Sequence, residues 1–231
     1  MKRVVLFDID GTILWTDGAG RRAVHGALRD VFGVPARDGH EYDGKTDPQI
    51  VHELMLLAGI GAPEIQHRLP EALARYVELL GVELGDLDHR DKIFPGVVAL
   101  LDALDARDDV LLGLLTGNVR EGAVAKLTAV GLEPDRFRIG AFGSDHAERP
   151  ELPAIARARA EALLGCEVSG GSVVVIGDTP ADMACGRGIG ARAIGVATGR
   201  YSTDDLRACD AAAVFTDLSD TAAVMHAIMG D

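Results

Sequence analysis

The sequence has few cysteines and comparatively few basic residues, and it lacks long apolar runs. Its three cysteines, Cys166, Cys185 and Cys209, form neither a disulfide framework nor a CxxC pair, which indicates a reducing compartment. Lysine and arginine number 23 against 36 acidic residues, for a formal net charge of −13, and they form no cluster. A basic patch is the usual mark of a nucleic-acid-binding surface, so we expect no nucleic-acid partner.

The distribution of apolar residues also predicts neither a targeting segment nor a membrane-spanning segment. Only four apolar residues precede Asp8 at the N-terminus, which is too short for the core of a signal peptide. No apolar run reaches the length of a membrane-spanning helix, about 20 residues. We therefore expect a cytoplasmic protein without a membrane partner. For the oligomeric state, we expect either a monomer or a homodimer.

Hydrophobic residues make up 48% of the 231 residues, which suits one large globular domain or one domain with an insertion. Short apolar runs bounded by Gly, Asp or Asn alternate with helical patterns such as 96–106 and 154–164. Predicted strands lie at 4–7, 110–116, 138–142, 172–177, 192–196 and 212–215. Apolar strands that alternate with helices predict an α/β fold, a Rossmann-like parallel sheet between two helical layers.

One stretch interrupts the alternation. Between residues 16 and 92 the sequence predicts helices and no strand, as in PQIVHELMLLAGI and EALARYVELL. Segments rich in Gly, Pro or charge, 16–20 and 88–96, flank this stretch as its expected joints. We therefore predict a catalytic core formed by 1–15 and 93–231, with an inserted α-helical cap domain at 16–92.

Carboxylates gather where the predicted strands end. Asp8 and Asp10 follow the first strand in FDIDGT, and Asp178 and Asp182 follow another in IGDTPAD. Ligands of open α/β sheets bind outside the carboxyl ends of the strands, so these side chains are expected to converge. Neighbouring carboxylates repel one another, and a hard divalent cation with oxygen ligands relieves the repulsion. The four aspartates therefore predict a Mg²⁺ site.

A third strand end supplies different chemistry. Thr116 ends the strand at 110–116, and Gly117 and Asn118 follow it before a predicted helix. A hydroxyl and backbone N–H groups at the start of a helix form a favourable environment for phosphate oxygens. Carboxylates, Mg²⁺ and a phosphate cradle at one sheet edge together suggest phosphoryl transfer.

The ordered motifs DIDGT, TGN, a cation ahead of PELPAIARARAEAL, and GDTPAD resemble those of the haloacid dehalogenase superfamily of hydrolases. The helical stretch after the first motif is similar to the cap of its phosphoglycolate phosphatase-like members. The resemblance implies that Asp8 is the nucleophile, forming an aspartyl-phosphate, and that Asp10 is the general acid and base. It also implies that Asp8, Asp178 and the Asp10 carbonyl bind Mg²⁺. Asp182 is then a direct ligand or a partner of metal-bound water.

The resemblance extends to the groups that bind phosphate. Thr116 is expected to hold a phosphoryl oxygen, with help from the backbone of Gly117 and Asn118. The third motif usually carries lysine, and the best-placed cation here is Arg149, whose alternative is a surface pair with Glu148 or Glu151. Lys45 either meets a substrate anion from the cap or is a solvated residue just before a helix.

The implied function is Mg²⁺-dependent hydrolysis of a phosphomonoester of a small metabolite, with phosphoglycolate as the nearest named example. Three alternatives remain open. A 2-haloacid dehalogenase would not need the acid at Asp10, and a sugar phosphomutase would need a cap that holds two phosphate groups. A non-catalytic binding protein of the same fold would be expected to have lost Asp8, Asp10 or the Gly-Asp motif.

Overall fold

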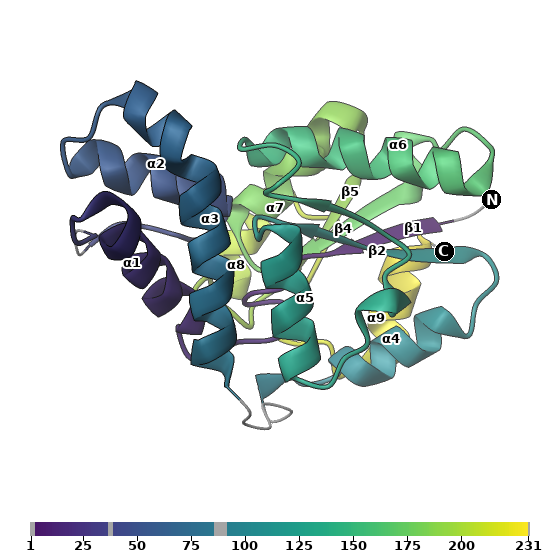
Figure 1. The fold of residues 1–231 in the computed structure, drawn as a ribbon. Coiled ribbons are helices and arrows are strands. Elements are labelled where there is room, and N and C mark those ends of the chain that lie inside the picture. Colours follow the sequence, from purple (N-terminus) through teal and green to yellow (C-terminus); the bar gives the residue numbers. More distant parts are fainter. Residues whose placement is uncertain (1–2, 37–38, 86–91, 231) are drawn as a thin grey trace.

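Six parallel strands form the centre of the protein, in the order β3-β2-β1-β4-β5-β6. The computed structural model describes residues 3–36, 39–85 and 92–230 (Figure 1). All six strands coincide with predicted segments to within one residue at either end. They are β1 (Arg3–Phe7), β2 (Val110–Thr116), β3 (Ile139–Phe142), β4 (Val173–Gly177), β5 (Arg192–Val196) and β6 (Ala213–Phe215).

The strand order places β1 between β2 and β4, where the direction of winding reverses. Val4 of β1 is aligned with Leu111 of β2 on one side and with Val173 of β4 on the other. The carboxyl ends of β1, β2 and β4 therefore lie beside one another at the topological switch point. This arrangement confirms the predicted α/β class and brings the three motif-bearing strand ends together.

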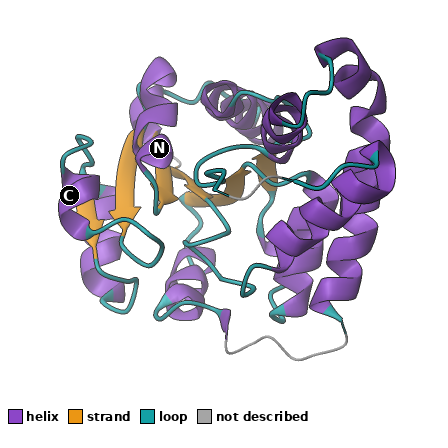
Figure 2. Cartoon of the chain, turned by 90° about the vertical axis from the view of Figure 1, so that its left-hand side faces the viewer, coloured by secondary structure: helices purple, strands orange, loops and turns teal. Residues whose placement is uncertain are grey.

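Helices cover both faces of the sheet, and Figure 2 shows the strands enclosed between them. One face packs under α4 (Val97–Asp105), α5 (Arg120–Ala129) and α9 (Thr221–Met229). The opposite face is covered by α6 (Leu152–Leu164), α7 (Pro180–Cys185) and α8 (Thr203–Arg207). Short 3₁₀ turns occur at Pro134–Arg136, Arg149–Glu151, Gly170–Ser172 and Gly186–Ile189. Among the described residues, no helix has both the length and the apolar character needed to cross a bilayer.

Within the described residues, three further helices lie between β1 and α4 in the sequence and form another layer. These are α1 (Ala19–Phe32), α2 (Asp47–Leu57) and α3 (Ala62–Leu84), which bury a second apolar cluster together with Val119 at the start of α5. In Figure 1 they stand beside the sheet, at the end away from the N-terminus and next to the carboxyl ends of the strands. The joint expected at 88–96 lies partly outside the described residues.

Candidate active site

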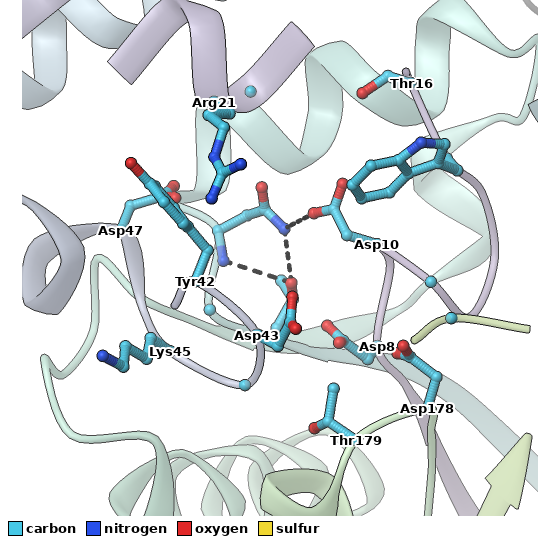
Figure 3. Close-up of a pocket in the computed structure, with 18 of the residues that line it drawn as sticks. Asp8, Asp10, Thr16, Arg21, Tyr42, Asp43, Lys45, Asp47, Asp178 and Thr179 are labelled. Atoms are coloured by element: carbon cyan, nitrogen blue, oxygen red, sulfur yellow. Dashed lines mark hydrogen bonds between the residues drawn. The ribbon is translucent and has the colours of Figure 1, made fainter. Parts of the chain in front are cut away.

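A cavity of about 640 Å³ lies between the carboxyl ends of the strands and the helical layer. Asp8, Asp10 and Asp178 line it from the sheet side, and Arg21 and Tyr42 line it from the helical side (Figure 3). Its walls therefore combine the predicted catalytic motifs with residues of the stretch that interrupts the alternation.

The turn after β1 depends on glycine. Gly11 has a φ of +82°, and a Cβ atom on it would lie 2.2 Å from a carboxylate oxygen of Asp178. A residue without a side chain is thus needed for the chain to turn and for Asp178 to approach it. This close approach gathers three buried carboxylates: ligand atoms of Asp8, Asp178 and Asp182 all lie within 4.8 Å of one another.

Burial and mutual repulsion disfavour negative charge on two of these carboxylates. Burial is the main cause that raises the pKa of Asp8 to about 6, opposed by the Arg149 charge. The pKa of Asp178 rises to about 9, mainly through burial and then through the charges of Asp182 and Asp8. A cation bound between the two would favour their ionised forms, so this pair of cavity-lining carboxylates fits a hard divalent cation.

Arg149 and Asp182 form a buried ion pair next to Asp8. The Arg149 Nη2 atom contacts Asp182 Oδ1 and lies 3.1 Å from Asp8 Oδ2. Both side chains are almost fully buried, so Arg149 does not form the alternative surface pair with Glu148 or Glu151. Asp182 Oδ2 accepts hydrogen bonds from the Thr179 backbone N–H (3.0 Å) and hydroxyl (2.7 Å). Both carboxylate oxygens of Asp182 therefore already have partners within the protein.

Asp10 lies at the centre of a second network. Lys126 Nζ lies 2.8 Å from Asp10 Oδ1 and 2.6 Å from Oδ2, and Asn118 Nδ2 donates to Oδ2 at 2.8 Å. Lys126 also donates to Asn118 Oδ1 at 2.7 Å and is only 4% exposed. These contacts fix the Asp10 carboxylate at the cavity wall.

The Thr116–Gly117–Asn118 turn follows β2, as predicted. The buried Thr116 hydroxyl accepts hydrogen bonds from the Asn118 side chain at 2.8 Å and backbone N–H at 3.3 Å. All three residues line the cavity. The Asn118 side chain therefore organises the turn, in addition to the backbone role expected for this residue.

The segment 43–47 docks on this turn. The Asp47 backbone N–H donates to the Gly117 carbonyl, and Asp47 Oδ2 accepts from the Val119 N–H, both at 2.8 Å. Thr46 donates its hydroxyl to the Ala147 carbonyl at 2.5 Å. A Cβ atom on Gly117 would lie 2.0 Å from the Lys45 carbonyl oxygen, so the glycine permits this approach. The helical layer is thus closed over the strand ends.

Lys45 lines the cavity but has a partner within the helical layer. Its Nζ atom lies 2.5 Å from Glu53 Oε2. In Figure 3 the ammonium end points away from Asp8 and Asp178. Lys45 is therefore paired rather than free in solvent, and contact with a substrate anion stays a prediction.

Sequence reasoning missed Lys126, Asp47 and Arg21. Lys126 lies eight positions after Asn118 on α5, outside the TGN motif, and only the spatial proximity of that helix to β1 reveals its partner. Asp47 is the first residue of α2 and belongs to none of the motifs identified in the sequence. Arg21 is one of two adjacent arginines, and the sequence gives no sign that it, rather than Arg22, lines the cavity.

The family of haloacid dehalogenase-like hydrolases matches residues 2–190. The chain belongs to this family. It is therefore a hydrolase, and the resemblance seen in its motifs is confirmed. A similar relative is the protein named "Probable phosphatase IndB" of Dickeya dadantii (strain 3937), with 27% identity over 231 residues. The match covers 99% of this chain and 96% of the relative.

Solved structures of similar fold cover almost the whole chain. A hydrolase from Pseudomonas syringae has a TM-score of 0.69 at 21% identity, covering 97% of this chain and 98% of that one. A predicted phosphoglycolate phosphatase from Haemophilus somnus gives 0.70 at 19% identity, with the same coverage. A β-phosphoglucomutase from Clostridium difficile gives 0.72 at 16% identity, covering 100% and 98%. At these identities the likeness establishes the shared fold.

Proposed function

We propose that this hydrolase cleaves phosphomonoesters of small metabolites with Mg²⁺, through an aspartyl-phosphate on Asp8. The proposal rests on one observation: two groups of functional residues lie together at one edge of the sheet. Asp8 and Asp178 form an acidic site at the ends of β1 and β4, and Asp10 is held beside it by Lys126 and Asn118. The relative named a probable phosphatase supports the same reaction class.

In the proposed reaction, a carboxylate oxygen of Asp8 attacks phosphorus, and the bond from phosphorus to the ester oxygen breaks. Asp10 enters this step in its protonated form and donates that proton to the departing alkoxide, which leaves as an alcohol. The Asp10 carboxylate then takes a proton from water as the water oxygen attacks the aspartyl-phosphate. Inorganic phosphate and the Asp8 carboxylate result, so both aspartates return to their starting states.

Asp8 and Asp178 would hold Mg²⁺, together with the backbone carbonyl of Asp10. The bound ion would neutralise negative charge so that a carboxylate can approach a phosphoryl group. Asp182 fits the outer position better than direct ligation, because Arg149 and Thr179 occupy both of its carboxylate oxygens. Arg149 would hold Asp8 and Asp182 in place, with its planar guanidinium serving both carboxylates.

The turn after β2 would receive the phosphoryl group. Thr116 is proposed to contact a phosphoryl oxygen through its hydroxyl, and the N–H groups of Gly117 and Asn118 to surround the same group. Lys45 is proposed to reach substrate only if it leaves Glu53. Phosphoglycolate remains the nearest named substrate, and its distal carboxylate gives it two anionic groups.

The helical layer is proposed to act as a cap. Residues 16–92 would open to admit substrate and close to exclude water, while 1–15 and 93–231 form the catalytic core. The apolar cluster formed mainly by α1–α3 and the docking of Asp47 on the Gly117 turn support this division.

Hydrolysis of p-nitrophenyl phosphate tests the proposal. We expect turnover with Mg²⁺ and none with excess EDTA, and loss of turnover in Asp8→Asn and Asp10→Asn. Metal-independent chloride release from 2-chloropropionate, without phosphatase activity, would instead identify a dehalogenase. Interconversion of sugar phosphates faster than phosphate release would identify a mutase.

A further inference from the structure

Among the described residues, one basic side chain of the cavity forms no ion pair with a carboxylate. Among the described residues, its lining includes five lysines and arginines. Four of them pair with carboxylates: Lys45 with Glu53, Lys126 with Asp10, Arg149 with Asp8 and Asp182, and Arg200 with Glu41 and Asp43. Arg21 of α1 is the fifth, and it has no carboxylate partner in the described part of the chain.

Arg21 is held in place by uncharged groups. Its guanidinium carbon lies 4.3 Å from the centroid of the Tyr42 ring, and Nη2 donates to the His40 carbonyl at 3.1 Å. Within residues 3–36, 39–85 and 92–230, its other N–H groups make no hydrogen bond to protein. In the view of Figure 3 the guanidinium projects between Tyr42 and Asp10. A stacked guanidinium with free donors is a preorganised anion-binding group.

That Arg21 has no carboxylate partner in the described segments is informative in this protein. Acidic residues outnumber basic ones by 36 to 23, and every other cation in the cavity has acquired an acidic partner. The cavity lining also includes apolar side chains, among them Trp15, Val24 and Ile50. An anion that enters with the substrate would therefore meet a guanidinium that forms no ion pair within the described residues.

We infer that Arg21 binds a second anionic group on the leaving part of the substrate, a carboxylate or a second phosphate. The substrate class is then a small phosphomonoester that carries this second anion on a short carbon chain. The inference rests on the proposed function, because the first phosphate must be the group transferred to Asp8. Arg21 is thereby assigned a role in specificity and none in the chemical step.

A matched substrate series tests this assignment. One arm contains ω-phosphooxy carboxylic acids with one to four methylene groups, each paired with its carboxamide. A second arm contains α,ω-alkanediol bisphosphates, each paired with the monophosphate of the same diol. The two arms show whether the second anion is a carboxylate or a phosphate. p-Nitrophenyl phosphate, which lacks a second anion, reports the unassisted activity of every variant.

For the wild type we expect the member that carries the second anionic group, in at least one pair, to have a kcat/KM roughly tenfold or more above that of its partner without it. Arg21→Met should reduce that ratio to near one, with most of the change in KM, and Arg21→Lys should restore part of it. Arg22→Met is the matched control on the same helix, because Arg22 pairs with Glu83 and does not line the cavity. It should leave the ratio unchanged.

Several results would overturn the inference. Ratios near one in the wild type, with p-nitrophenyl phosphate hydrolysed normally, would refute the subsite and leave the proposed function intact. An equal loss on all substrates in Arg21→Met would show that Arg21 only supports the fold of the loop that carries Tyr42. Failure of the wild type to hydrolyse any phosphomonoester would refute the proposed function itself.

Discussion

Lys126 Nζ lies within 2.8 Å of both carboxylate oxygens of Asp10, and this contact joins helix α5 to the turn that follows β1. The same ammonium group bonds Asn118, whose amide also bonds Asp10. Three side chains from two neighbouring strand ends and one helix thus fix each other's positions. A proton donor must lie within hydrogen-bond reach of the leaving oxygen, so the proposed reaction depends on this network.

Lys126→Met keeps a long apolar side chain on α5 and removes both contacts to Asp10. We expect kcat for p-nitrophenyl phosphate to fall roughly 10- to 100-fold with little change in KM, because Asp10 loses its fixed orientation. Arg120→Met is the matched control, since Arg120 is exposed at the start of α5 and stacks on Phe142. A Lys126→Met enzyme with kcat within twofold of the wild type would contradict the role given to Lys126.

Arg149→Met leaves Asp8 and Asp182 buried without their common cation. Breaking a buried ion pair from one side costs about 3–5 kcal/mol, so we expect a loss of that order in the free energy of unfolding. Urea titrations in EDTA measure it, and Arg149→Lys should lose less. Arg75→Met removes an exposed arginine that pairs with Asp30 and Glu78, and it should change stability little. If Arg149→Met and the wild type had equal free energies of unfolding, the prediction would be wrong.

Gly117→Ala places a methyl group where the Lys45 carbonyl oxygen lies, 2.0 Å from the ideal Cβ position. The segment 43–47 must then move away from the turn after β2, which weakens the hydrogen bonds of Asp47. We expect kcat/KM for p-nitrophenyl phosphate to fall roughly tenfold or more, because small displacements of positioning groups are costly. Gly188→Ala is the control, with open space around its Cβ. Equal activity of the two variants would argue against a docked cap.

Asp47→Asn tests the electrostatics of the docked segment. Burial is the main cause that raises the pKa of Asp47 to about 6, from an ordinary value of 3.8. The folded state therefore binds more protons than the unfolded state between these values, so the Asp47 contribution to stability falls as pH rises from about 4 to 6. Asparagine keeps an acceptor for the Val119 N–H and removes the titration.

Unfolding free energies of Asp47→Asn and wild type, compared in EDTA from pH 4 to 7.5, measure this effect. We expect the difference to grow with pH in favour of the variant, reaching on the order of 1–3 kcal/mol above pH 6. The comparison cancels the slopes that Asp8 and Asp178 contribute to both proteins. A difference that stays constant across the range would show that Asp47 does not titrate as described.

Much of the fold could be predicted because its signals are local. Each strand is a short apolar run that ends in a polar or glycine-containing turn, and six such runs correspond to the six strands observed. The motifs at Asp8, Thr116 and Asp178 were readable because each follows directly on a strand, and parallel strands end at one sheet edge. Their convergence then follows from the strand order.

The partners of these motifs could not be predicted in the same way. Lys126 contacts Asp10 across 116 residues of sequence, and α5 carries no pattern that marks one lysine as buried. Arg149 was identified by position, but its contacts with Asp8 and Asp182 depend on how α7 packs beside it. Lys45 was expected to meet either a substrate anion or solvent. In the structure it forms an ion pair with Glu53 of α2.

Chemical trapping of the phosphorylated enzyme tests the central claim most directly. Wild-type protein is mixed with Mg²⁺ and substrate, quenched in acid and reduced with borohydride, which converts an aspartyl-phosphate to homoserine. Peptide mass spectrometry then locates the converted residue. We predict conversion at Asp8 alone, dependent on substrate and absent in Asp8→Asn. Phosphate release without conversion at Asp8, or with conversion at Asp10 instead, would contradict the account.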